Sequence, residues 1–256
     1  AATVLHDRKS ARIGGRVDFN TLEPTLITRA LPHLKQLAGV RLPFSGAAHF
    51  EVASNWRLMG MRLQLASPVG QAMIGMQYPP AGDRVHVVAR LEKVNLAGLA
   101  RATPEMASLA GLDLPISGQI EGDAASAEEF QLSRIDLTGG QGRIELPGVL
   151  PRPVGVTGVR LQAELRDNQT KITVKDFTLD LGGPSLRATA TAERDGETFR
   201  VRSKGTASKV AMAALDNYWP IGLGPVARKW VTTNIVDGVV DDATFEAAAI
   251  VPANGD

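Results

Sequence analysis

The chain has 256 residues, and its 28 lysines and arginines nearly balance its 27 aspartates and glutamates. A near-neutral chain without a basic stripe argues against nucleic acid as a partner. Cysteine is absent, which excludes disulfides, thiolate metal ligands and cysteine nucleophiles.

No apolar run approaches the roughly 20 residues that a membrane-spanning helix needs. The sequence also shows no signal peptide and no initiating methionine, and it opens inside a strand-like pattern. We therefore expect residues 1–256 to be one continuous fragment of a larger repeat protein, with any membrane anchor outside it.

The first predicted elements are a strand and a kinked helical region. Arg16–Phe19 alternates polar and apolar residues, which is typical of a strand with one buried face. A helix is expected from about Leu22, with Pro24 in its first turn, where the missing N–H carries no penalty. Pro32 then ends this helix and starts a second short one.

Part of this helical region returns 72 residues later. Ile27–Gly46 aligns without a gap with Leu99–Gly118, and 10 of the 20 positions are identical. A fixed period indicates stacked supersecondary units, and this one is long enough for a helix and several strands. We expect units at about 16–87, 88–159 and 160–256, the third incomplete. The identical pairs are Arg29/Arg101, Ala30/Ala102, Pro32/Pro104, Leu37/Leu109, Ala38/Ala110, Gly39/Gly111, Leu42/Leu114, Pro43/Pro115, Ser45/Ser117 and Gly46/Gly118.

The repeated motif indicates architecture rather than chemistry, although chance similarity between Ala-, Leu- and Gly-rich segments is the alternative. Thr103 is a plausible helix N-cap, with Pro104 at the first helical position. Gly39 and Gly111 follow Leu-Ala pairs and are expected to be left-handed C-terminal caps. The motif would then be a kinked helix, a glycine stop and entry into a strand.

After each copy of the motif the apolar period becomes two, which predicts antiparallel sheet with one solvated face. One strand pattern breaks its own parity. Ile172 and Val174 share one face, whereas Phe177 and Leu179 follow in the opposite parity. A β-bulge near Lys175–Asp176 would bring both pairs to one side of the sheet.

A third helix is expected over 224–236. Pro225 can open it, Gly238 follows it, and a strand pattern resumes at Val239. Trp219 and Trp230 are expected to pack where this helix meets the sheet. The order of helix, glycine and strand matches the first two units.

The search for catalytic or ligand-binding motifs finds none. The histidines His6, His33, His49 and His86 show no metal-ligand spacing. Gly222–Ala227 formally matches a dinucleotide fingerprint, but Tyr-Trp-Pro precedes it in place of a buried strand, and Pro225 removes an N–H needed for phosphate. Gly139–Gly142 is better explained as a turn between strands. We therefore predict no catalytic residue, no cofactor, no metal and no enzymatic activity.

One segment resembles a known family. Trp219 and Pro220, then Arg228 and Trp230, then Asn234–Gly238 and a strand are similar to a segment of the AsmA-like superfamily. The closest branch is the YhdP-type proteins, which carry a domain of unknown function and are distantly similar to TamB. The resemblance covers essentially the whole chain, and it gives Trp219, Pro220, Arg228, Trp230 and Gly238 a structural role.

The resemblance implies a mainly β fold with short helices, in which helix-plus-antiparallel-strand units build a long curled sheet with an apolar concave groove. Such proteins are periplasmic, are anchored to the inner membrane of Gram-negative bacteria and bridge the two membranes. They are implicated in phospholipid transfer and in outer-membrane integrity. The implied partners are phospholipid acyl chains and, through regions outside this fragment, both membranes.

The physical chemistry of lipid transfer agrees with this implication. Moving an acyl chain through water costs about 0.8 kcal/mol per CH₂, so lipid transfer needs a path that is shielded from water. It needs no nucleophile, because no bond is broken. The alternative is a non-enzymatic scaffold that assembles outer-membrane or secreted β-proteins by pairing with their strands. On that alternative, charges such as Arg200, Arg202 and Lys204 would discourage strand addition. We expect the groove to be lined by Leu63, Leu65, Val87, Leu91, Ile172, Val174, Leu179, Leu181, Leu186, Ala188 and Val201.

Overall fold

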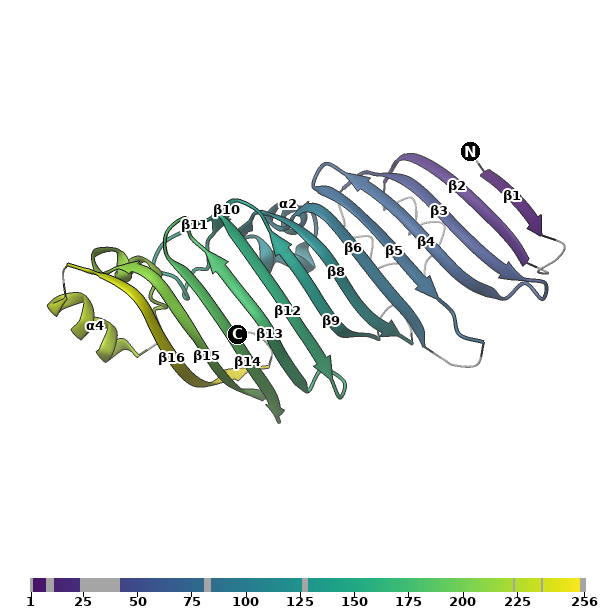
Figure 1. Cartoon of the computed structure of the whole chain (residues 1–256). Helices are drawn as coiled ribbons and strands as arrows, with labels where there is room; N and C mark the ends of the chain where they lie inside the picture. Colours follow the sequence, from purple (N-terminus) through teal and green to yellow (C-terminus); the bar gives the residue numbers. More distant parts are fainter. Residues whose placement is uncertain are drawn as a thin grey trace. The chain divides into compact units, whose positions relative to one another are not determined.

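The computed structural model describes residues 2–7, 12–23, 42–80, 84–125, 129–222, 224–235 and 237–253. The fold is mainly β, with 63% strand against 13% helix, and its main feature is a large antiparallel sheet that is not closed (Figure 1). This confirms the predicted class of a β protein with short helices. The chain divides into two compact units.

The first unit comprises Ala1–Ala110 and Ile116–Ile135. Its strands pair in the order β1-β2-β3-β4-β5-β6-β8-β9, almost wholly in sequence order (Figure 1). Short turns join most neighbours, because consecutive antiparallel strands need little chain between them. The elements are β1 (Ala2–Asp7), β2 (Arg12–Leu22), β3 (Phe44–Ala53), β4 (Leu58–Ser67), β5 (Gly70–Gln77), β6 (Val85–Asn95), α2 (Leu96–Ala102), η2 (Pro104–Leu109), β8 (Pro115–Ala124) and β9 (Phe130–Gly139).

The second unit comprises Gly111–Pro115 and Asp136–Asp256. It contains the end of β9, followed in the sheet by β12-β13-β14-β15-β16, and a small sheet ordered β11-β10-β7. Its elements are β7 (Leu112–Asp113), β10 (Gly142–Ile144), β11 (Val154–Val156), β12 (Gly158–Arg166), β13 (Lys171–Asp180), β14 (Ser185–Asp195), β15 (Thr198–Ala211), η3 (Met212–Ala214), α3 (Leu215–Tyr218), α4 (Pro225–Asn234) and β16 (Val239–Pro252).

The 72-residue repeat is visible in where the strands begin. β4 starts at Leu58 and β9 at Phe130, and β5 starts at Gly70 and β10 at Gly142. The third strand of each copy then has different partners. β5 pairs within the large sheet, whereas β10 pairs with β7 and β11 in the small one. The expected repeat units 16–87, 88–159 and 160–256 stay a prediction.

The second copy of the motif forms the predicted kinked helix. Asn95 caps α2 by accepting a hydrogen bond from the Gly98 N–H at 2.6 Å. Thr103 then occupies the N-cap of η2 and Pro104 its first position, as predicted, although the Thr103 hydroxyl makes no capping bond. The first copy, including Gly39 and His33, lies outside the described residues.

The expected left-handed cap at Gly111 is wrong. Gly111 is not among the residues with positive φ, and the C-cap of η2 is Ala110 in the right-handed region. Glycine is required there for a different reason. A Cβ on Gly111 would lie 1.7 Å from the Glu145 carbonyl oxygen, so the two backbones meet only without a side chain.

The bulge predicted in β13 is confirmed. Val174 pairs with Ala190 of β14 and Phe177 with Ala188, so Lys175 and Asp176 together face one residue of that strand. The extra residue restores the parity of the strand. The apolar side chains on both sides of the bulge therefore lie on one face.

Fully buried apolar side chains are few and mostly small. In the first unit three of them, Ala97, Ala100 and Ala102, belong to α2, and in the second unit Val154 and Val156 belong to β11 of the small sheet. The apolar side chains along the long strands stay partly exposed. The buried set is Leu42, Ala47, Val94, Ala97, Ala100, Ala102, Leu114, Ile116, Val154, Val156, Ala163 and Val210.

Candidate functional site

The second unit carries a continuous apolar face, which is built by strand register. Directly paired residues of antiparallel strands project to the same side of a sheet. Val174 pairs with Ala190, and Ala190 with Ser203 across β14 and β15. The apolar face of this unit consists of Val159, Leu161, Ala163, Leu165, Ile172, Val174, Phe177, Leu179, Leu186, Ala188, Ala190, Ala192, Val201, Ser203, Gly205, Ala207, Ala243, Phe245, Ala247 and Ala249.

The opposite side of the same strands is polar and charged. Arg160 of β12 bonds Asp176 of β13 at 3.2 Å there, and Lys175 contacts Glu164. Lys175 holds the pKa of the Glu164 carboxyl below its usual range, chiefly through their hydrogen bond. These charged side chains all lie on the solvated side of the strands. The opposite side of the sheet therefore remains apolar.

Six of the predicted lining residues lie on the apolar face of the second unit, and each of them is partly exposed. A seventh, Leu181, lies in the turn that follows β13. Besides the large sheet, the described strands form only the β11-β10-β7 sheet, whose strands have two or three residues. No second large sheet therefore covers this face in the described part of the chain. The six residues are Ile172, Val174, Leu179, Leu186, Ala188 and Val201.

The other four predicted lining residues share one face of the first unit. Leu65 pairs with Ala72, and Ala72 pairs with Leu91. Leu63 and Val87 lie on the same side in neighbouring rows, and all four leucine and valine side chains are partly exposed. Each unit thus has an apolar face, and the sequence pattern identified members of both.

Phenylalanine rings cover glycines on these faces, a feature that the sequence did not indicate. The Phe245 ring lies over Gly205, its Cζ 2.7 Å from where a Cβ would be, and Phe50 lies over Gly15 in the same way at 2.0 Å. Each Phe is directly paired with its glycine across two strands. The rings lie flat against the sheet because the glycines leave room, and only the register reveals the pairing.

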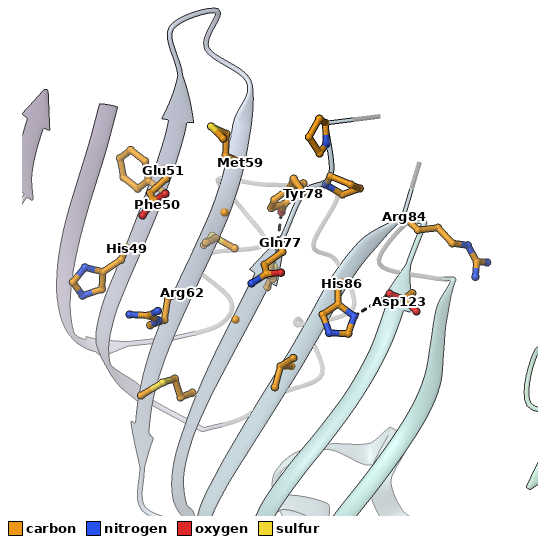
Figure 2. Close-up of a pocket in the computed structure, with 18 of the residues that line it drawn as sticks. His49, Phe50, Glu51, Met59, Arg62, Gln77, Tyr78, Arg84, His86 and Asp123 are labelled. Atoms are coloured by element: carbon orange, nitrogen blue, oxygen red, sulfur yellow. Dashed lines mark hydrogen bonds and ion pairs between the residues drawn. The ribbon is translucent and has the colours of Figure 1, made fainter. Parts of the chain in front are cut away.

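The hollows over the strands lie on the polar side. One of them, of about 920 Å³, is in the first unit and is lined by His49, Arg62, Gln77, His86 and others (Figure 2). Two more, of about 670 and 620 Å³, lie on the polar side of β13 to β16. The resemblance implied an apolar concave groove, whereas these three hollows lie on the polar side and the apolar faces of the strands are partly exposed surfaces. A further, apolar hollow of about 570 Å³ lies at α4, beside Val226 and Trp230.

The segment that carried the family resemblance forms a small helical substructure. Arg228 of α4 donates to Asp216 at 2.6 Å and so joins α4 to α3. Gly224 precedes Pro225 in a left-handed conformation, and Gly238 also has positive φ, at +112°. The expected packing of Trp230 is wrong, because its side chain is 61% exposed. Trp219 and Pro220 are partly exposed.

The described residues hold no group of three or more metal-binding side chains. His6 lies in β1, and His86 approaches Asp123 at 3.1 Å. Gly139–Gly142 is the turn between β9 and β10, as predicted. None of the helices that the structure describes has the length and apolar character to span a bilayer.

Comparison with known proteins gives no match: no family model, no curated protein and no solved structure matches this chain.

Proposed function

We propose that the apolar faces bind the hydrocarbon chains of phospholipids, and that the chain is one segment of a periplasmic bridge that transfers lipid between the inner and outer membranes. The observation that carries the proposal is the apolar face of β12 to β16, which is aligned by register and partly exposed along its strands. The bridging role and the location are what the family resemblance implies.

The dimensions and chemistry of this face suit hydrocarbon. Five strands span about 19 Å at about 4.8 Å per spacing, and ten residues run about 33 Å along a strand. Its side chains are aliphatic or aromatic, apart from Ser203 and Gly205. Covering such a surface with an acyl chain removes apolar area from water on both partners, at about 25 cal/mol per Å². The absence of specific polar contacts lets a chain slide.

Native mass spectrometry of the purified chain tests the proposal. We expect phospholipid to co-purify, and a double variant, Val87→Asp with Ile172→Asp, to lose it because each carboxylate would meet hydrocarbon. The matched control places the same charges on the polar side, outside the hollow, as Gln64→Asp with Thr173→Asp. The control should keep the lipid. The proposal is contradicted if the wild-type protein purifies without lipid. It is also contradicted if both double variants lose lipid equally while their circular dichroism spectra show that they remain folded.

A second candidate, strand addition to client β-proteins, is favoured by one feature. β16 is the last strand of the large sheet in the described part of the chain and has 14 residues. Arg200, Arg202 and Lys204, expected to protect an edge, lie instead on β15, which pairs on both sides. Capture of unfolded outer-membrane strands without lipid, in the same experiment, favours this candidate over lipid transfer.

A further inference from the structure

The 920 Å³ hollow on the polar side of the first unit, here called the polar hollow, has a glycine floor (Figure 2). Gly60 pairs with Gln77, and Gly75 pairs with Arg62. A Cβ on Gly60 would have only Met76 O near it, at 3.5 Å, and one on Gly75 only Val88 O, at 3.9 Å. No neighbouring group occupies the space above these glycines, so the sheet surface is depressed between the longer side chains around it.

The charge around the polar hollow is predominantly positive. Arg12, Arg62, Arg84 and Arg90 line it, against the two carboxylates Glu51 and Asp123. Two of the arginines bond neutral amides: Arg90 donates to Gln119 at 2.9 Å, and Arg84 donates to Gln131. Those contacts orient the guanidinium groups but leave their charge uncompensated.

Arg62 is the cation at the centre of this arrangement. It stands directly opposite His49 on β3 and opposite Gly75 on β5. Among the described residues it has no hydrogen-bond or ion-pair partner. His49 in turn stands opposite Arg16, whose guanidinium pairs with Asp18 at 2.6 Å and holds the pKa of that carboxyl below its usual range. Asp18 thus compensates Arg16 and leaves Arg62 unpaired.

We propose that the polar hollow binds the phosphate group of a ligand, with Arg62 as its main contact. A guanidinium presents paired N–H donors that match a phosphate in a bidentate manner. The glycine floor leaves room for the phosphate beside Arg62, and Pro79 and Pro80 provide a less polar rim for the rest of the ligand. A bound anion would also relieve the unfavourable opposition of Arg62 to any positive charge on His49.

This site is distinct from the apolar face. Arg62 precedes Leu63 on β4, and successive residues of a strand point to opposite sides of the sheet. A lipid whose chains lie on the apolar face therefore does not reach Arg62 through the sheet. The phosphate could belong to a soluble phosphate ester or to the headgroup of another phospholipid, because both present the same oxygens.

Nuclear magnetic resonance of the 256-residue chain, titrated with glycerol phosphate, tests the proposal. We expect the Arg62 Nε–H signal and the Gly60 and Gly75 amides to shift and saturate together. Arg62→Gln should weaken binding at least about tenfold, because it removes a charge-assisted pair. The matched control is Arg134→Gln, because Arg134 is an exposed residue of β9 that does not line the hollow; this variant should bind as wild type does.

A steric variant separates the site from general charge effects. Gly75→Val keeps Arg62 but fills the floor, and its Cβ meets no atom nearer than 3.9 Å, so the strand can accept it. We expect it to lose binding as Arg62→Gln does. Absence of saturation, wild-type affinity in Arg62→Gln, or equal weakening in Arg134→Gln overturns the proposal.

Vesicles distinguish the two sources of phosphate. The site is assigned to a lipid headgroup if the wild-type chain floats with phosphatidylglycerol vesicles but not with phosphatidylcholine vesicles, and if Arg62→Gln abolishes this flotation. Saturable glycerol phosphate binding without flotation assigns it to a soluble ester. If neither probe depends on Arg62, the hollow is no phosphate site. These results are independent of whether phospholipid co-purifies on the apolar face.

Discussion

Gly111 and Glu145 meet backbone to backbone. The Glu145 N–H donates to the Gly111 carbonyl at 2.7 Å, and a Cβ on Gly111 would lie 1.7 Å from the Glu145 carbonyl oxygen. The contact continues the pairing of β7 with β10, in which Leu112 stands opposite Ile144. The glycine of the repeated motif is therefore needed for close approach of two strands.

Gly111→Ala should destabilise the second unit by about 1–3 kcal/mol, because the added methyl forces the Glu145 backbone to move. The measurement is urea unfolding followed by circular dichroism. Gly155→Ala on β11 is the control, since nothing lies within 4 Å of its Cβ position. Similar unfolding midpoints for the two variants would show that the close approach of the two backbones does not require glycine at position 111.

Deletion of Lys175 should be tolerated, whereas deletion of Thr178 should not. Lys175 is the extra residue of the bulge, and without it Val174 and Phe177 keep their places on the apolar face. Removing Thr178 instead moves Leu179 to the polar side, since a one-residue shift inverts the side-chain pattern. We expect the first deletion to change the free energy of unfolding by less than about 1 kcal/mol, because it loses only an exposed ion pair.

Thermal unfolding of the two deletions provides the comparison. The Thr178 deletion should lose several degrees more than the Lys175 deletion, at about 4 °C or less per kcal/mol for a chain of this size. The reverse order of melting temperatures would mean that the bulge itself stabilises the strand.

Phe245→Ala should loosen β16. The ring covers Gly205 of β15, and its loss exposes the glycine backbone to water. Because the ring is partly exposed, the expected cost is about 1–2 kcal/mol, less than for a fully buried phenylalanine. Amide hydrogen exchange in β16 should accelerate. The control is Ile250→Ala on the same strand: Ile250 is 72% exposed on the polar side, so this variant should leave amide exchange unchanged. Equal acceleration of exchange in the two variants would mean that the contact of the ring with Gly205 does not stabilise β16.

Asp180 should contribute to acid stability of the β13–β14 turn. The Gly182 N–H donates to its carboxylate at 2.9 Å, and this bond, with one from Thr157, holds the pKa of Asp180 below its usual range. A lowered native pKa means that the contribution is complete above the unfolded-state value of about 3.9 and is lost as the pH falls through the native value.

Carboxyl-carbon resonance titration should show Asp180 releasing its proton below the ordinary aspartate range. Asp180→Asn should remove this part of the pH dependence of stability, while the part contributed by the other carboxylates with a lowered pKa, Asp18 and Glu164, remains. An ordinary titration midpoint for Asp180 would mean that the turn does not hold the carboxylate in solution.

The alternation of apolar residues along the sequence was enough to predict several features of the fold. It predicted a β fold with one solvated face, and the opposite parities of Val174 and Phe177 required the bulge that the structure contains. The 72-residue period found in the sequence recurs in the fold, since β4 and β9 begin 72 residues apart. These features follow from the period of two along a strand, which is a local property that the residue order carries in full.

Tertiary structure decided which strands are neighbours and what each glycine is for. β5 and β10 begin 72 residues apart, yet one pairs in the large sheet and the other in the small one. From the sequence Gly111 is predicted to be a helix cap, and only the structure shows that it lies against Glu145. From the sequence Arg62 is an ordinary solvated charge, and only strand pairing places it opposite Gly75 and His49. Pairing between distant segments depends on the whole chain, so the polar hollow and the continuity of the apolar face exist only in the folded sheet.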